Sequence, residues 1–210
     1  MPTPRATPQH RPTLVVRAMR SSHELEEIQR FRYQVCAQEY GQAHLEGTNH
    51  RTQTIGDHLD RDFTVFGAFV DNALVGTLRW GLLSWTERPH RHTCHLRALG
   101  FDNPQQIGIT DRLVLAPEMR RLSTIRELAT TVATYALFAG SVHEFCWASP
   151  RITPLYMQLG YRDTGVQVTN DGGESLTILQ LDLGEPDALK TIRSPLCGGW
   201  NIPDLSAHAA

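Results

Sequence analysis

The residues best suited to chemistry lie together between 109 and 125, in the sequence ITDRLVLAPEMRRLSTI. Branched apolar residues predict a buried strand over 109–115, with Asp111 and Arg112 set into it. Pro117 ends this strand, because proline donates no hydrogen bond to a strand ladder. A carboxylate in such a strand can accept a proton from a substrate or pair with a neighbouring arginine, and both interpretations stay open.

A long helix is expected directly after this strand, because apolar residues recur at helical spacing between 118 and 141. Backbone N–H groups at a helix start have no partner within the helix, so they form a cradle for an anionic phosphate beside Arg120 and Arg121. The N–H groups concerned are those of Arg121, Leu122, Ser123, Thr124 and Ile125. The alternative is that Arg120 and Arg121 are only the solvated start of a helix.

Two further groups bear on metal binding and nucleophilic catalysis. His90, His92, Cys94 and His95 are metal-ligand residue types at close spacing, but no second cluster completes a four-ligand set. A polar surface loop is therefore the preferred interpretation, and no metal site is predicted. Cys146 lies on a predicted buried strand with no histidine beside it, so it is expected in the core rather than as a nucleophile.

Composition places the chain among ordinary globular proteins. Its 210 residues suggest one domain, with residues 1–12 as a disordered leader, 13–184 as the domain and 185–210 as a C-terminal extension. A net charge of -2 argues against general nucleic-acid binding. The sequence holds no apolar run long enough for a membrane span, no secretory signal pattern and no paired cysteines, so a reduced cytoplasmic protein is expected.

The rest of the pattern alternates strands with a few helices. Strands are expected at 13–19, 62–70, 73–83, 109–115, 145–149, 161–168 and 175–183, and helices at 22–40, 118–141 and 150–160. Residues 42–61 are expected to form a loop with at most a turn of helix, and 85–106 an irregular segment.

This order resembles the GNAT acyltransferase superfamily, and three stretches carry the resemblance. LVLAPEMRRLSTI is similar to the family's pyrophosphate loop; Pro117 and Arg120 match, whereas Ser123 and Ile125 stand where glycine or alanine is usual. VFGAFVDNALVGTLRW is similar to the second and third strands, and SPRITPLYMQLGYR to the N-x-x-A-x-x-L-Y-x-x-x-G-F segment. The resemblance implies an α/β (α+β) domain with a mixed, mostly antiparallel central sheet of six or seven strands flanked by helices.

Within the superfamily, FRYQVCAQEYG, DHLDRDFTVFGAF and TDRLVL resemble stretches of acyl-homoserine lactone (autoinducer) synthases and long-chain N-acyl amino acid synthases. Ile109 and Asp111 depart from the group's E-x-S-R pattern, replacing its glutamate and its serine. The resemblance implies an enzyme that moves an acyl group onto the amine of an amino acid or related small amine. The donor is acyl-CoA or acyl-phosphopantetheine on an acyl carrier protein, a co-substrate rather than a permanently bound cofactor.

The resemblance also assigns residues to the donor. The phosphate falls to the N–H groups of 121–125 with Arg120, and the thioester carbonyl to backbone N–H groups near Leu113 and Leu115. Tyr156 is the candidate acid for the leaving thiolate; the alternative is a packed aromatic side chain with a surface hydroxyl.

On the acceptor side, Asp111 lies two residues from the usual glutamate and therefore on the same strand face, so it is the candidate base. Arg112 matches the relatives' arginine that orients the acidic network or the substrate. The alternative is that Asp111 forms an ion pair with Arg112 or Arg79. Other candidates for binding the acceptor are Arg32, Glu39, Asp57, Asp60 and Arg79. The three acids among them are also alternatives to Asp111 as the base. Surface arginines such as Arg32 or Arg121 are expected to dock an acidic carrier protein.

Two rival functions stay open. One is an autoinducer synthase that uses S-adenosylmethionine, which the missing glutamate at Ile109 disfavours. The other is a module that binds acyl thioesters or carrier protein without catalysis.

Overall fold

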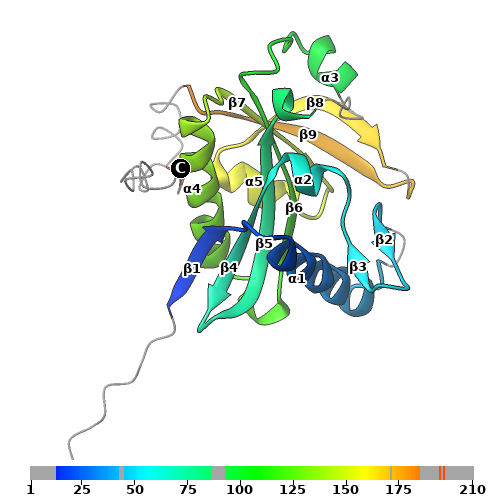
Figure 1. Ribbon diagram of the computed structural model, residues 1–210. Helices are drawn as coiled ribbons and strands as arrows, with labels where there is room; N and C mark the ends of the chain where they lie inside the picture. Colours follow the sequence, from blue (N-terminus) through cyan, green and yellow to red (C-terminus); the bar gives the residue numbers. More distant parts are fainter. Residues whose placement is uncertain are drawn as a thin grey trace, which may run out of the picture.

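A seven-stranded sheet dominates the fold (Figure 1). The computed structural model describes residues 13–42, 45–86, 93–170 and 172–184, with Ser194 and Leu196. In this part of the chain the strand order is β1-β4-β5-β6-β7-β9-β8, and every neighbouring pair is antiparallel except β6 and β7. The strands are β1 (Leu14–Ala18), β4 (Thr64–Val70), β5 (Ala73–Leu82), β6 (Ile107–Leu115), β7 (His143–Ala148), β8 (Arg162–Thr169) and β9 (Ser175–Asp182). The predicted mixed, mostly antiparallel sheet is confirmed.

Helices cover both faces of this sheet. The α-helices are α1 (Ser22–Tyr33), α2 (Leu59–Asp62), α3 (Thr93–Ala98), α4 (Leu122–Phe138) and α5 (Thr153–Leu159). Helices α4 and α5 pack on one face through a large apolar cluster, whereas α2 and α3 contribute to a smaller cluster on the other face. No helix in the described part is long and apolar enough to cross a membrane.

The first helix begins where its sequence predicts. Ser21 accepts a hydrogen bond from the Glu24 backbone N–H at 3.2 Å, and the Glu24 carboxylate accepts one from the Ser21 backbone N–H at 3.0 Å. This reciprocal capping box satisfies donors that the helix itself leaves unpaired. The chain continues as a π-helical segment (Gln34–Glu39) and leaves the helix at Gly41, whose φ of +69° suits glycine.

The N-terminal half of the chain also contains two short strands and a tight turn. Strands β2 (Thr48–Asn49) and β3 (Thr54–Ile55) pair within the segment expected to be a loop. The strands expected at 62–70 and 73–83 form a hairpin, β4 to β5, whose turn residues Asp71 and Asn72 both adopt positive φ, at 48° and 66°.

Two predictions about helices were wrong. The helix expected from 118 begins at Leu122, because a 3-10 turn (Pro117–Met119) and an extended Arg121 come first. The segment 85–106, expected to be irregular, contains the 3-10 helix Leu83–Trp85 at its edge and helix α3 within it. Only Leu96 of α3 is buried, so that helix gives no apolar period in the sequence.

We predict that Ser21→Ala lowers the free energy of unfolding by about 1 kcal/mol, since it removes the acceptor of the capping box. Chemical denaturation at neutral pH measures this difference. Ser22→Ala is the matched control, because Ser22 is exposed at the first helical position and holds no cap. Equal losses in both variants would contradict the assignment of the cap to Ser21.

Candidate active site

The sheet opens between β6 and β7. The two strands pair only where Ile107, Gly108 and Ile109 lie opposite residues 143–145. Strand β6 continues to Leu115 and β7 to Ala148 without further pairing, so the strands diverge toward the start of α4. This is the splay that the family resemblance implies, which sequence alone does not reveal.

The open edge of β6 presents the polar groups of Leu115. The Ala116 N–H donates to the Val75 carbonyl at 3.0 Å, and Leu115 lies opposite Gly76. Because neighbouring residues of an antiparallel strand point their N–H and C=O groups in opposite directions, those of Leu115 face away from β5. Arg120 Nε donates a hydrogen bond to the Leu115 carbonyl oxygen at 3.2 Å. The Leu115 N–H therefore faces the opening, where the predicted thioester carbonyl would lie.

A bulge in β6 decides which residues face which layer. The register between β5 and β6 shifts between Thr77 and Arg79, and Arg112 adopts a φ of +55°. Before the bulge, Asp111 shares the sheet face of Ile109; after it, Leu115 joins the apolar cluster under α4. One strand thus serves both sides of the sheet.

Six charged side chains form one cluster against this strand, here called the ion network: Arg32, Asp57, Asp60, Arg79, Asp111 and Arg112. Arg79 is its centre and is 1% exposed. Its Nε and Nη2 donate to the two oxygens of Asp111 at 2.7 and 2.6 Å. Its Nη1 donates to Asp57 at 2.5 Å and to Asp60 at 3.0 Å.

The ion network has a fully buried part, here called its floor, and a partly exposed part, here called its rim. Arg32 Nη1 donates to both oxygens of Asp60 at 2.8 and 2.9 Å, and both side chains are 0% exposed. At the rim, Arg112 Nη2 donates to Asp57 at 2.7 Å and to the Glu46 carbonyl at 3.0 Å. The side chains of Asp57, Arg112 and Asp111 are 14%, 15% and 26% exposed. A small polar ligand would therefore meet these three.

The arginines keep the rim carboxylates ionised. Burial alone would raise the pKa of Asp57, but hydrogen bonds and charge from Arg79, and then from Arg112, hold it below its usual range. Burial would also raise the pKa of Asp111, but the charge and hydrogen bonds of Arg79, together with the charge of Arg112, lower it. The ion pair between Asp111 and Arg79, one of the two interpretations open from sequence, is thus present in the structure.

Arg32 does not lie where carrier-protein docking requires it. The expectation of a surface arginine is wrong, because its guanidinium is buried against Asp60. Burial lowers the pKa of Arg32, and Asp60 restores part of that loss. Its Nε and Nη2 are buried with no hydrogen-bond partner within the described part of the chain, a condition that internal water commonly relieves.

Glu39 and Arg120 pair with each other outside the ion network. Arg120 Nη2 lies 3.6 Å from the Glu39 carboxylate, and its guanidinium stacks on Tyr40 at 4.2 Å from the ring centre. In this structure the guanidinium of Arg120 is thus engaged with Glu39, Tyr40 and the Leu115 carbonyl. Arg121 is exposed at the N-cap of α4.

The predicted phosphate cradle has fewer available backbone N–H groups than the sequence led us to expect, because three of the five donate within the protein. The Arg121 N–H donates to the Met119 carbonyl at 2.7 Å, and those of Thr124 and Ile125 donate to the Arg121 carbonyl at 3.1 and 3.2 Å. The first helical N–H groups, of Leu122 and Ser123, are the pair best placed for an anion.

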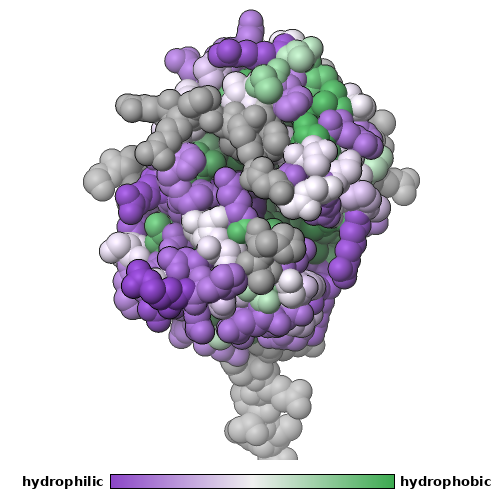
Figure 2. Space-filling view, turned by 90° about the vertical axis from the view of Figure 1, so that its right-hand side faces the viewer, coloured by the Kyte–Doolittle hydropathy of each residue, from purple (hydrophilic) through white to green (hydrophobic). Residues whose placement is uncertain are grey.

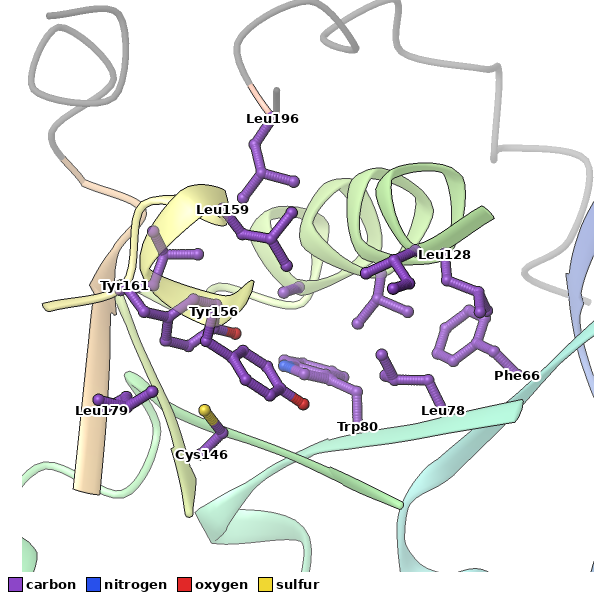
Figure 3. Close-up of a cluster of buried hydrophobic side chains, with 14 of the residues drawn as sticks. Phe66, Leu78, Trp80, Leu128, Cys146, Tyr156, Leu159, Tyr161, Leu179 and Leu196 are labelled. Atoms are coloured by element: carbon purple, nitrogen blue, oxygen red, sulfur yellow. The ribbon is translucent and has the colours of Figure 1, made fainter. Parts of the chain in front are cut away.

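A cavity lies between the open part of the sheet and helices α4 and α5 (Figure 3). It measures about 20 Å³. Its lining is mostly apolar: Leu78, Thr110, Leu113, Ile125, Ala129, Val132, Ala133, Glu144, Tyr156, Leu159, Tyr161, Leu181 and Leu196. The outer surface is mostly hydrophilic in Figure 2, with hydrophobic surface showing where the molecule is hollowed.

Tyr156 lines this cavity and is 6% exposed. Its ring meets that of Tyr161 edge to face, with centres 5.1 Å apart. Burial raises the pKa of the Tyr156 phenol well above its ordinary value, so the phenol holds its proton. Tyr156 is thus packed like a core aromatic, yet its side chain borders the space next to β6.

The groups considered for metal binding and covalent catalysis lie elsewhere. The described residues hold no cluster of three or more metal-binding side chains, and His90 and His92 lie outside the described residues. Cys146 is 1% exposed in the apolar core, as predicted, and burial raises the pKa of its thiol.

Comparison with known structures supports the same fold. The AHL synthase LasI is 14% identical to this chain, with a TM-score of 0.66 over 92% of this chain and 99% of LasI. FeeM, an N-acyl amino acid synthase from uncultured soil microbes, is 15% identical, with a TM-score of 0.61 over 90% of this chain and 98% of FeeM. BjaI, a CoA-dependent acyl-homoserine lactone synthase solved with SAM and isopentyl-CoA, is 16% identical, with a TM-score of 0.63 over 83% of this chain and 84% of BjaI.

The chain has the fold of these synthases. The predicted fold, a mixed and mostly antiparallel sheet flanked by helices, is therefore confirmed. No known family profile and no curated protein matches the sequence.

Asp111 and Ile109 lie on the same face of β6 but in different surroundings. Ile109, which replaces the glutamate expected from the resemblance, is 0% exposed in the smaller apolar cluster. Asp111, on the same face and two residues along, supplies both carboxylate oxygens to Arg79. The chain thus has an acid beside Arg79 although position 109 is apolar.

Sequence reasoning missed Glu144, a buried acid on the cavity wall. It is 2% exposed and accepts hydrogen bonds from Ser141 Oγ at 2.6 Å, Trp80 Nε1 at 2.7 Å and Thr110 Oγ1 at 3.2 Å. Burial raises its pKa to about 7, although these three bonds oppose the change. A side chain on Gly108 would come within 2.1 Å of its Oε1, so the glycine opposite was the available signal in the sequence.

We predict that the protein becomes less stable as pH rises from about 4.5 to 7, and that Glu144→Gln abolishes this pH dependence. A folded pKa of about 7 against the ordinary 4.5 means that the unfolded chain ionises first over this range. Stability then falls by about 3 kcal/mol between these pH values and stays level above them. The substituted glutamine can keep the three contacts, since its amide can donate to Ser141 Oγ while its oxygen accepts from Trp80 and Thr110.

Chemical denaturation of both proteins from pH 4.5 to pH 8 measures this effect. The variant should match the natural protein at the acidic end and exceed it at the alkaline end. Parallel pH profiles would show that Glu144 does not titrate in this range.

Proposed function

We propose that the protein is an N-acyltransferase, which moves an acyl group from a thioester donor to the amine of an amino acid or related small amine. The observation that carries the proposal is the opening between β6 and β7. It lies between an apolar cavity on one face of the sheet and the open rim of the ion network on the other. In the proposal, the acyl thioester lies at this opening on the side of the cavity, and the amine approaches it from the side of the rim.

The donor half of the proposed site uses groups along β6, α4 and α5. The Leu122 and Ser123 N–H groups, with the exposed Arg121 beside them, bind a phosphate of CoA or phosphopantetheine. The Leu115 N–H donates to the thioester carbonyl and stabilises the oxyanion that forms on attack. The acyl chain enters the cavity beside Tyr156, whose phenol protonates the leaving thiolate.

The acceptor half uses the rim of the ion network. Asp111 and Asp57 stay ionised, so they attract the ammonium form of the acceptor, and Arg112 orients it. In this proposal the proton of the ammonium passes to Asp111, directly or through water. The lowered pKa of Asp111 makes it a weak base, so it passes the proton on to solvent at once. The free amine then forms a C–N bond as the C–S bond breaks.

The similar structures support this proposal at the level of the fold. Among them, FeeM is an N-acyl amino acid synthase and BjaI is an acyl-homoserine lactone synthase that was solved with SAM. S-adenosylmethionine therefore belongs in any test as one acceptor among the amino acids. CoA and carrier-protein donors are both to be compared.

We expect thiol release when the purified protein is given an acyl-CoA or acyl-carrier-protein donor together with its amine. A thiol-reactive dye follows turnover, and mass spectrometry identifies the amide. A panel of donors from acetyl to decanoyl against amino acids and S-adenosylmethionine covers the proposed substrates. Absence of both thiol release and amide for every pair would sink the proposal; tight donor binding without turnover would favour a binding module.

We predict that Asp111→Asn and Tyr156→Phe each reduce turnover, the first by about 100-fold and the second by about tenfold or more. The asparagine cannot accept the proton, and the phenylalanine cannot supply one. Glu118→Gln is the matched control, since Glu118 is an exposed acid on the turn after β6. Thermal unfolding of each variant checks that the fold persists. Rates equal to that of the control would reassign both roles.

A further inference from the structure

We propose that Leu196, from the C-terminal extension, closes the far side of the acyl cavity and restricts the enzyme to short-chain acyl donors. This inference rests on the proposed function, because it assigns a substrate class to the same site. It concerns a residue that lies outside the motifs described above and comes after the rest of the cavity lining in the chain.

Leu196 is part of the core. Its side chain is 3% exposed and belongs to the apolar cluster that joins the sheet to α4 and α5. Figure 3 shows it beside Leu159, pointing from the extension toward the space between the two helices. It is also one of the residues that line the cavity.

A specific pair of hydrogen bonds holds Leu196 in place. Ser194 Oγ donates to the carbonyl of Leu159, the last residue of α5. Carbonyls at the end of a helix have no partner within it, so the serine satisfies one of them. The Leu196 backbone N–H in turn donates to Ser194 Oγ at 3.2 Å. The buried hydroxyl of Ser194 thus links the end of α5 to the backbone of Leu196 and orients that residue.

The same cavity borders the proposed reaction centre. Its lining includes Leu113 and Ile125, beside the donor groups, and Tyr156, the proposed acid. Leu181 and Leu196 also line it, so an acyl chain that enters beside Tyr156 shares one space with Leu196. The free volume is about 20 Å³, little more than one water molecule needs. Every acyl chain must therefore move some of the lining side chains, and a longer chain must move more of them, Leu196 included.

The test compares natural protein and Leu196→Ala with acyl-CoA donors from acetyl to decanoyl, at a fixed concentration of the amine that supports turnover. We expect the natural protein to favour the short donors and the variant to favour longer ones. Each additional methylene that the variant buries should raise kcat/KM by about fourfold, the factor that corresponds to burying one methylene group.

Two further variants serve as a matched control and as a milder substitution at position 196. Met157→Ala is the matched control, because Met157 lies on the same helix as Leu159 but is 51% exposed and does not line the cavity. It should leave the donor preference unchanged. Leu196→Val removes one methylene from the same position and should shift the preference in the same direction, by a smaller amount, if the alanine variant does not fold. An unchanged preference in every folded Leu196 variant would overturn the proposal.

A binding measurement separates this proposal from the proposed function. S-alkyl analogues of CoA cannot transfer their chain, so calorimetry with graded alkyl lengths reports the cavity alone. If neither protein acylates any amine but Leu196→Ala binds the longer analogues more tightly, the limit set by Leu196 stands and the transferase assignment fails. If both proteins turn over and bind all chain lengths alike, the limit fails and the transferase assignment stands.

Discussion

The guanidinium of Arg79 is the group on which the acceptor side of the site depends. It is almost fully buried in the middle of the sheet and contacts carboxylates from three places: Asp57 before α2, Asp60 within α2 and Asp111 on β6. A buried cation without its partners is strongly unfavourable, and breaking one such pair typically costs about 3–5 kcal/mol. Satisfying Arg79 therefore fixes α2 and its preceding loop against the sheet, and Arg32 on α1 follows through Asp60. The positions of Asp57 and Asp111 at the rim therefore depend on the buried Arg79.

The bulge at Arg112 connects that network to the other face of the sheet. A regular strand would place Asp111, Leu113 and Leu115 on one side. The positive φ at Arg112 breaks the alternation, so the acid joins Arg79 while the leucines face the cavity and α4. Arginine is an unusual residue in that conformation, and its side chain is held by Asp57 and the Glu46 carbonyl. The same contacts that close the ion network thus support the strained residue.

Sequence reasoning reached the elements whose signals are local. The helix expected from residue 22, the two strands on either side of Asp71-Asn72 and the strand around Asp111 depend on neighbours in the chain, and all are present. It did not reach properties set by distant partners. Helical spacing leaves either Arg32 or Phe31 on the apolar face of the first helix, and only Asp60 decides between them. Leu196 gave no signal, because its partner Leu159 is far away in sequence.

The two halves of the proposed site differ in polarity, and this difference favours direct transfer over a covalent route. An acyl-enzyme would need a nucleophile within reach of the donor, but Cys146 is buried among apolar residues, where the thiolate form is disfavoured. The acceptor rim, by contrast, concentrates ionised carboxylates that attract an ammonium group. Under the proposed function the amine and thioester must therefore be bound together. The opening between β6 and β7, next to the bulge, is where a charged acceptor and an apolar acyl chain can meet without either entering the other's surroundings.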